Sequence, residues 1–183
     1  ITPIIGVDDI FPGSGSVVGL GDMTPTFFFS PKEPTKGGLI WGAGPVFLLP
    51  TATDDLLGAD QWGMGPSFLV LKQQNGWTYG ALVNHIERVA GDDRLADISM
   101  SFMQPFVSKG FPSGLTIGLN TESTYYWNTD QWTVPVNLTM SQVTKWGTQL
   151  LQLTGGLRYY AEAPKNGPEW GIRLGVTLLY PKK

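Results

Sequence analysis

The feature that most constrains the fold of this chain is a two-residue alternation of apolar and polar side chains that persists over long segments. In "EWGIRLGVTLLY" (residues 169–180), alternate side chains from Trp170 to Tyr180 are apolar, whereas those from Glu169 to Thr177 are polar or glycine. Because successive side chains of a β-strand point to opposite faces, this pattern predicts a strand with one wholly apolar face. The 24 glycines and 14 prolines interrupt nearly every window that could hold a long helix, so we expect an all-β fold.

Ten segments of the chain are candidate strands, although the alternation is less regular in the earlier ones. They are residues 1–7, 21–30, 39–49, 62–72, 77–85, 96–104, 115–127, 131–142, 149–163 and 169–180. Most are about 9 to 12 residues long, whereas strands of soluble sheets have a mode of about 5 to 6 and a tilted membrane-spanning strand needs about 9 to 11. Strand length therefore predicts an antiparallel transmembrane β-barrel with about ten strands.

The connectors between these segments form two alternating sets. One set contains residues 8–21, 51–61, 88–95, 128–130 and 164–168, and the other contains residues 31–38, 73–76, 108–114 and 144–148. The first set holds the two longest connectors and the acidic clusters, as expected of the outer loops of a membrane barrel, whose periplasmic turns are shorter. In the second set, Asn75-Gly76 predicts a tight hairpin turn.

Two nearly identical stretches, "WGAGP" from Trp41 and "WGMGP" from Trp62, begin successive candidate strands. Antiparallel neighbours start on opposite sides, so we expect these tryptophans to lie in opposite aromatic girdles, where Trp and Tyr meet the lipid headgroups. The girdle candidates are Trp41, Trp62, Trp77, Tyr79, Tyr125, Trp127, Trp132, Trp170 and Tyr180. The alternative is a tandem duplication whose position has no meaning.

Polar side chains occupy the face opposite the apolar one on four consecutive candidate strands, and in a barrel this face lines the lumen. The lumen candidates are Asn120, Glu122, Asn137, Gln152, Arg158, Glu162 and Arg173. Two interpretations remain open at this point. The charges could line a path that selects solutes, or they could pair with one another and fill the interior of a narrow barrel.

The single histidine raises the question of catalysis. Asn84 and His85 lie one candidate strand away from Ser99 and Ser101, so a membrane-embedded Ser–His hydrolase is one interpretation of this region. However, His85 shares its face with Trp77 near an expected interface, and no nucleophile motif surrounds the serines. We therefore interpret His85 as an interfacial residue, and we expect no catalytic residues and no enzymatic activity.

Composition argues against several other classes of function. The acidic residues Asp54, Asp55, Asp60, Asp92 and Asp93 lack the alternating carboxylates of a calcium loop, so we interpret them as loop charge that faces solvent or lipopolysaccharide. The glycine-rich stretch "GSGSVVGLG" lacks the flanking strand and helix of a phosphate loop. A net charge of −3 provides no basic surface for nucleic acid. We expect no metal and no cofactor.

Several longer stretches are distinctive, namely "LGDMTPTFFFSP", "WGAGPVFLLPTATDDLLG", "WTYGALVNHI", "LNTESTYYW", "QWTVPVNL" and "GPEWGIRLGVTLLYPK". Together they resemble a family of outer-membrane transporter-like proteins of Gram-negative bacteria, grouped with the meta-pathway phenol degradation proteins and sometimes mislabelled neuromedin U. The resemblance runs from about Val18 to Lys182. It implies an outer-membrane β-barrel that acts as a channel or transporter, and it implies further strands before Ile1, up to twelve in the complete protein.

Together these observations predict one β-barrel domain over residues 1–183, located in the bacterial outer membrane. Its expected function is passive passage of small solutes, with aromatic or hydrophobic compounds as candidates. The expected partners are outer-membrane lipid, lipopolysaccharide and the solute, with no nucleic acid, and a homo-oligomer is compatible with the sequence. The alternatives are a filled barrel without transport and a soluble all-β protein that binds a small molecule.

Overall fold

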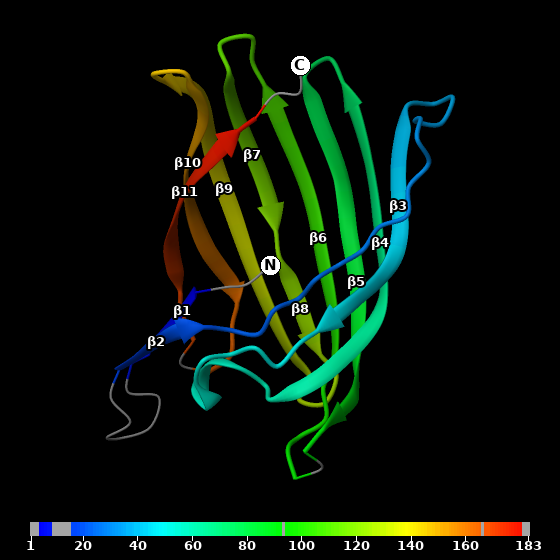
Figure 1. The fold of residues 1–183 in the computed structure, drawn as a ribbon, viewed down its shortest axis with the longest axis vertical. Coiled ribbons are helices and arrows are strands. Elements are labelled where there is room, and N and C mark those ends of the chain that lie inside the picture. The colour runs from blue at the N-terminus through cyan, green and yellow to red at the C-terminus, as the bar shows by residue number, and fades with distance from the viewer. Residues whose placement is uncertain (1–3, 9–15, 93, 166, 181–183) are drawn as a thin grey trace.

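A computed structural model describes residues 4–8, 16–92, 94–165 and 167–180, with side chains from residue 16 onward. These residues are built almost entirely of antiparallel β-strands (Figure 1). The one helical segment that they contain is η1 (Asp55–Leu57), a short 3-10 turn. No helix in the described part of the chain is long and apolar enough to cross a membrane.

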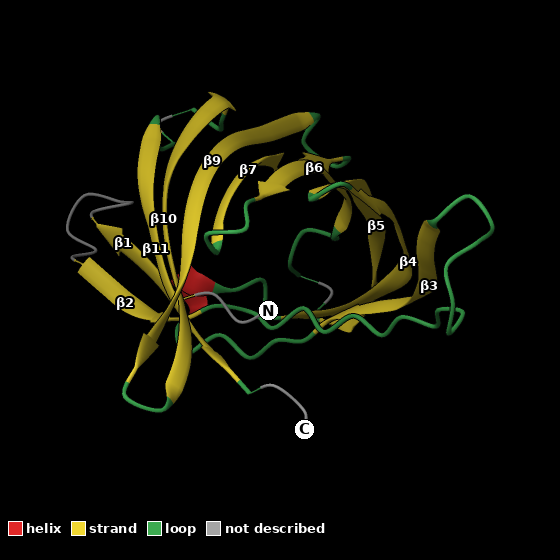
Figure 2. Ribbon diagram, turned by 90° about the horizontal axis from the view of Figure 1, so that it is seen from above, coloured by secondary structure: helices red, strands yellow, loops and turns green. Residues whose placement is uncertain are grey.

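The main sheet contains nine strands. They are β3 (Leu39–Leu48), β4 (Gln61–Gln74), β5 (Trp77–Gly91), β6 (Ser99–Gly110), β7 (Leu115–Thr121), β8 (Ser123–Tyr126), β9 (Gln131–Trp146), β10 (Gln149–Glu162) and β11 (Trp170–Leu179). Their order is β11-β10-β9-β7-β6-β5-β4-β3, with β8 also lying between β6 and β9. The sheet curls around an interior (Figure 2). The prediction of an all-β antiparallel fold is confirmed, and β3 and β11 are not paired with each other in the described residues.

The N-terminal hairpin is a separate two-stranded sheet of β1 (Ile4–Asp8) and β2 (Ser16–Leu20). In both views it lies on the β10 and β11 side of the molecule (Figures 1 and 2). The predicted strand over residues 1–7 overlaps β1, although its ends differ. The prediction of a loop over residues 8–21 is wrong for residues 16–20, which form β2. The glycines around residues 16–20 led to the prediction of a loop, but these residues form a short strand that pairs with β1. Residues 9–15 lie outside the described residues.

Residues 21–30 do not form the regular strand that the sequence predicts. They run antiparallel beside β3, with bridges at Met23, Thr26 and Phe29. The carbonyl of Pro25 accepts from Phe47 at 3.0 Å and that of Pro45 accepts from Phe27 at 3.0 Å, but neither proline has an N–H to return the bond. Each proline therefore removes one of the two hydrogen bonds of its pair, whereas Phe29 and Ala43 exchange both, and this segment stays an extended but irregular neighbour of β3.

The sequence also predicts one strand over residues 115–127, which the structure divides at Glu122 into β7 and β8. Both parts pair with β6 and β9 in one continuous register. Across from Glu122 lies Pro135 of β9, which accepts the Glu122 N–H at 3.2 Å and has no N–H to donate. On the other side, the same register places Pro105 of β6 across from Thr121. The interruption is thus a local loss of hydrogen bonds between two prolines.

Several strands are longer than the sequence predicts. β5 continues beyond the predicted end at His85 to Gly91, and β6 continues through Pro105 to Gly110. Residues 75–76, 111–114 and 147–148 are short turns at one end, and residues 49–60, 92–98 and 163–169 connect strands at the other end by longer segments. The separation is not strict, because residues 127–130 at the second end are as short as residues 111–114 and residues 31–38 at the first end are longer. The predicted Asn75-Gly76 turn is confirmed, with φ of 52° and 76° as a type I′ turn requires.

The two Trp-Gly-x-Gly-Pro stretches lie side by side in β3 and β4, where Pro45 pairs with Pro66. Because the two strands are antiparallel, the glycine before each proline lies opposite the residue after the other proline. Gly44 lies opposite Ser67, and Gly65 lies opposite Val46. The carbonyl oxygen of Pro45 accepts a hydrogen bond from the N–H of Phe27, so the backbone polar groups of Pro45 point toward residues 21–30 and away from β4. The proline pair therefore costs the β3–β4 ladder little.

The second glycine of each stretch allows a neighbouring backbone to approach closely. A Cβ atom on Gly44 would lie 1.9 Å from the carbonyl oxygen of Phe27, and one on Gly65 would lie 1.8 Å from that of His85. Real atoms do not approach so closely, and no flexible side chain is available to move aside, because both oxygens belong to the main chain. The repeated glycines are thus required by strand packing rather than by a turn.

We expect Gly65→Ala to destabilise the fold by about 1–3 kcal/mol, because the new methyl group must displace the β5 backbone. Gly155→Ala on β10 is the matched control, since a Cβ there meets no atom within 4 Å. Urea unfolding of the refolded protein in detergent micelles measures both variants. Equal unfolding free energies for the two variants would contradict the close approach at Gly65.

Candidate functional site

The two faces of the main sheet differ in a way opposite to that of a soluble protein. On β11 the outward side chains are apolar and strongly exposed, with Leu174 at 82% and Val176 at 68%. The most buried side chains of the described residues include polar ones, with Ser67 at 0% and Asn137 at 1% exposure. Soluble proteins bury apolar side chains and leave polar ones in water. The concave face has an apolar part, where Val46, Leu48 and Ile86 form a buried cluster. Its part over β7, β9, β10 and β11 is polar and is the candidate site.

The aromatic residues of the outward face gather near both ends of the strands. Trp41, Trp77, Tyr79 and Tyr180, together with the unpredicted Trp146, lie toward the end with short turns, and Trp62, Tyr125, Trp127, Trp132 and Trp170 lie toward the other end. The structure thus places Trp41 and Trp62 at opposite ends, as predicted. Trp170 and Tyr180 delimit a stretch of about 33 Å along the strand, or about 23 Å at a 45° tilt, close to the about 25 Å of a barrel's apolar band.

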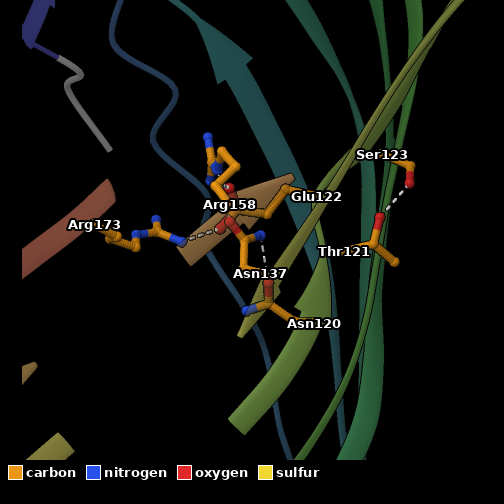
Figure 3. A network of polar contacts seen from close by, with 7 residues as sticks. All are labelled: Asn120, Thr121, Glu122, Ser123, Asn137, Arg158 and Arg173. Carbon is orange, nitrogen blue, oxygen red and sulfur yellow. Dashed lines mark hydrogen bonds and ion pairs between the residues drawn. The ribbon is translucent and has the colours of Figure 1, made fainter. Parts of the chain in front are cut away.

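Glu122 is the centre of a charged network on the concave face (Figure 3). Its Oε2 accepts a hydrogen bond from Nη2 of Arg158, and its Oε1 accepts one from Nη1 of Arg173 at 2.8 Å. The exposed fractions of these side chains are 20% for Glu122, 25% for Arg158 and 46% for Arg173. One carboxylate balances the charge of one of the two guanidinium groups, so the three side chains together carry a net charge of +1.

Two asparagines extend this network across the neighbouring strands. Nε of Arg158 donates to Oδ1 of Asn137 at 2.6 Å, and Nδ2 of Asn137 donates to Oδ1 of Asn120 at 2.7 Å. The register explains the chain of contacts, because Asn120 pairs with Asn137 and Asn137 pairs with Arg158. Directly paired residues of adjacent strands lie within side-chain reach on the same face. Figure 3 shows Thr121 of β7 and Ser123 of β8 on the side away from Asn120 and Glu122.

Two glycines lie opposite the two arginines on the paired strands, and an aromatic ring lies beside one of the arginines. Gly171 pairs with Arg158 and Gly156 pairs with Arg173, so neither guanidinium has a large side chain opposite it. The Arg158 guanidinium also lies 5.9 Å from the centre of the Tyr160 ring, within the range of a cation–π contact. The sequence pattern placed Tyr160 on the polar face but gave no reason to select it.

The structure brings together five of the seven predicted lumen candidates. Gln152 lies apart from the network and donates to Oγ of Ser141 at 2.8 Å, and Glu162 lies exposed at the end of β10. The predicted polar face is thus real along four strands. Which of its residues touch one another depends on strand register, and alternation alone does not determine register.

A hollow of about 280 Å³ adjoins the network on the concave face. It is lined by Gln104, Phe106, Val107, Ser108, Gly118, Leu119, Asn120 and Thr139. Asn120 belongs to both the hollow and the network. The sequence missed Phe106 and Ser108 because the predicted strand ended at Gln104, immediately before a proline that β6 in fact incorporates. Amide, hydroxyl and aromatic groups therefore meet a guanidinium-rich network in one place.

The acidic loops lie apart from this site. Asp92 accepts hydrogen bonds from the Arg94 side chain at 3.0 Å, and these bonds lower the pKa of Asp92 below its ordinary value. Asp22 accepts from the backbone N–H groups of Thr51, Ala52 and Ala59, and this holds the 49–60 loop in place. Within the described ranges, no group of three or more His, Cys, Asp or Glu side chains could hold a metal ion.

Comparison with known proteins gives no neighbour for this fold or site. No protein-family model, no curated protein and no solved structure matches the chain at a significant level. The resemblance described above therefore stays a prediction, and the site must be interpreted from its own geometry.

We expect Glu122→Gln to lower the free energy of unfolding by about 1–3 kcal/mol, between the values for exposed and for buried ion pairs. The amide keeps the shape of the side chain but leaves Arg158 and Arg173 without a carboxylate. Glu162→Gln makes the same chemical change at the exposed end of β10, and we expect less than about 0.5 kcal/mol. Urea unfolding in the same detergent gives the free energy of unfolding of both variants. Equal values for Glu122→Gln and Glu162→Gln would mean that the network contributes nothing to stability.

Proposed function

We propose that this chain is an outer-membrane β-barrel that lets small solutes pass along its polar concave face. The observation that carries this proposal is the reversed distribution of side chains, with strongly exposed Ile172, Leu174 and Val176 on one face of β11 and the charged network on the side facing the interior. A bilayer gives these apolar side chains a matching solvent, and the paired strands satisfy the backbone polar groups that lipid cannot.

A soluble all-β protein would need a partner or a second sheet to cover this apolar face. Contiguous apolar patches of more than a few hundred Å² are rare on soluble monomers. The exposed side chains extend over all strands from β3 to β11, and aromatic residues lie at both ends of them. A membrane environment accounts for both the extent of the face and its aromatic borders.

Passage would take place along the interior, where the solute meets fixed polar groups. The Arg158 and Arg173 guanidinium groups attract anionic or hydrogen-bonding groups, and the adjacent hollow offers the ring of Phe106 and the amide of Asn120. Small aromatic compounds that carry a polar substituent suit this combination. The mechanism is passive diffusion without a cofactor, and a continuous wall requires the gap between β3 and β11 to be filled in the membrane.

A filled barrel without transport is the second candidate, and one observation favours it. The network from Asn120 to Arg173 joins four neighbouring strand positions through side-chain hydrogen bonds, as interior groups do when they pack a narrow barrel. Electrical conductance distinguishes the two candidates, because a filled barrel inserts into a bilayer without conducting ions.

We expect Leu174→Arg to destabilise the protein in lipid vesicles by about 2–4 kcal/mol if the residue faces the bilayer midplane. Thr177→Arg, on the opposite face of the same strand, is the control and should change stability much less. Unfolding by urea is measured in phosphatidylcholine vesicles after folding is verified by heat-dependent migration on a gel. A harmless Leu174→Arg would exclude a lipid-facing position for this side chain.

We expect the protein in a planar lipid bilayer to conduct ions, and Arg173→Gln to shift the selectivity toward cations. The substitution removes a positive charge from the interior network and leaves the Arg158–Glu122 pair in place. Lys36→Gln removes the same charge from an exposed connector and should leave the reversal potential unchanged. Insertion without conductance would overturn the channel and support the filled barrel.

A further inference from the structure

A second polar group lies on the outward, apolar face, near the end of the sheet that carries the longer loops. Nδ1 of His85 lies 2.9 Å from Oγ of Ser101, and Nε2 of His85 lies 2.7 Å from Oε1 of Glu87. The three side chains therefore form a line from a hydroxyl through an imidazole to a carboxylate. A nucleophile, a base and a group that orients the base have this arrangement in hydrolases that form an acyl-enzyme.

Strand register brings these groups together. His85 of β5 pairs directly with Ser101 of β6, and Glu87 pairs directly with Ser99. Residues two apart on a strand share a face, so His85 and Glu87 stand next to each other and opposite the two serines. Oγ of Ser99 donates to the same Glu87 oxygen at 2.8 Å, which fixes the carboxylate against the imidazole.

The contacts determine where the imidazole proton lies. An ionised carboxylate can only accept hydrogen bonds, so the Glu87 contact requires the proton on Nε2. Nδ1 then has a free lone pair, which accepts the hydroxyl proton of Ser101. This is the tautomer that a general base needs, and either ring nitrogen can serve once the other is held by a carboxylate.

A hydrogen-bond donor stands beside the hydroxyl oxygen. Nε1 of Trp127 donates to Oγ of Ser101 at 2.9 Å. In this structure the N–H is used by Oγ, so it becomes available to the negatively charged carbonyl oxygen of an ester only when that hydrogen bond breaks during attack. A donor released in this way would stabilise the tetrahedral intermediate of acyl transfer.

We propose that Ser101, His85 and Glu87 hydrolyse an acyl ester presented by lipid at the outward face. Oγ of Ser101 bonds to the ester carbonyl carbon while its proton passes to Nδ1 of His85. The bond from that carbon to the alcohol oxygen then breaks, and the alcohol leaves with the proton from His85. Water repeats both steps on the acyl-enzyme, releasing the carboxylic acid and restoring the serine.

The surroundings of Ser101 select a lipid ester. Val83 is 38% exposed and Met103 is 45% exposed on the same outward face, so the ester would lie among apolar side chains. An apolar hollow of about 480 Å³ lies farther along this face, lined by Tyr79, Pro105, Val107, Leu119 and Val136 among others. Pro105 is about 13 Å from Ser101 along β6, a distance that an acyl chain spans.

This inference departs from the sequence-based expectation that the chain is not an enzyme. That expectation depended on the position of His85 on the apolar face near an interface and on the absence of a nucleophile motif around the serines. On a strand no such motif is needed, because alternation alone points Oγ of Ser101 out of the sheet and register supplies the base. The proposal rests on the proposed membrane location of the outward face but not on solute passage along the concave face. A protein that inserts and conducts without hydrolysis, or that hydrolyses lipid without conducting, therefore separates the two.

An alkyl fluorophosphonate, which bonds covalently to activated serines, tests the nucleophile in the detergent-refolded full chain. We expect Ser101 to be labelled, as identified by peptide mass, and labelling to be lost in Ser101→Ala and His85→Gln. Ser113→Ala, in an exposed turn, should be labelled like the unaltered protein. No label on the folded protein, equal label in Ser101→Ala, or full label in His85→Gln would each overturn the proposal.

Fatty acid release from phosphatidylcholine vesicles tests the activity itself. We expect release by the unaltered protein and a loss of about 10³-fold or more in Ser101→Ala and Glu87→Gln. Lys36→Gln, in an exposed connector at the other end of the sheet, should leave the rate unchanged. Heat-dependent gel migration verifies that each variant is folded. If one variant does not fold, the rate of fatty acid release is compared between the unaltered protein and the other variant. No release by the folded, unaltered protein, or release unaffected by both substitutions, would overturn the proposal.

Discussion

Cross-strand hydrogen bonding fixes the side-chain alternation on which the rest of this structure depends. Each strand is held by its neighbours, so its two faces cannot rotate independently, and one register decides what meets on both sides. On β5 and β6 that register places His85 against Ser101 on the outward face. On β7, β9 and β10 it places Asn120, Asn137 and Arg158 in one row on the concave face. Both polar groups are therefore consequences of strand pairing rather than of a local sequence motif.

Prolines modify this ladder at a few positions, and the site depends on one of them. Pro135 has no N–H to offer Glu122, and Pro105 lies across from the preceding residue, so the strand between them is interrupted. The interruption leaves the register unchanged. Glu122 therefore keeps its place on the concave face, where it accepts hydrogen bonds from Arg158 and Arg173. The two arginines satisfy the carboxylate of Glu122, which would otherwise be a partly buried charge without a partner.

The sequence was sufficient to predict the strand class, the Asn75-Gly76 turn and the polar face shared by the five lumen candidates of the network, because alternation and turn chemistry are local properties. It did not reveal the irregularity between Tyr160 and Glu162, after which Glu162 pairs with Val134. It was not sufficient to predict β2, which pairs only with β1, or the irregular segment opposite Pro45, because both depend on the partner strand. The contact between Glu122 and Arg173 joins residues far apart in sequence and needs the register of several strands. The same limit hid the contact between His85 and Ser101, although both residues had been considered.

The proline pattern around β3 also makes the two borders of the main sheet unequal. At one border, Pro25 and Pro45 remove alternate donors where residues 21–30 lie against β3. At the other border, β11 contains no proline, so the N–H groups that do not pair with β10 form an unbroken row along its free edge. A further strand, from this chain or from another copy, would pair along this edge without a missing donor. The free edge of β11 is therefore a position at which the sheet can be extended.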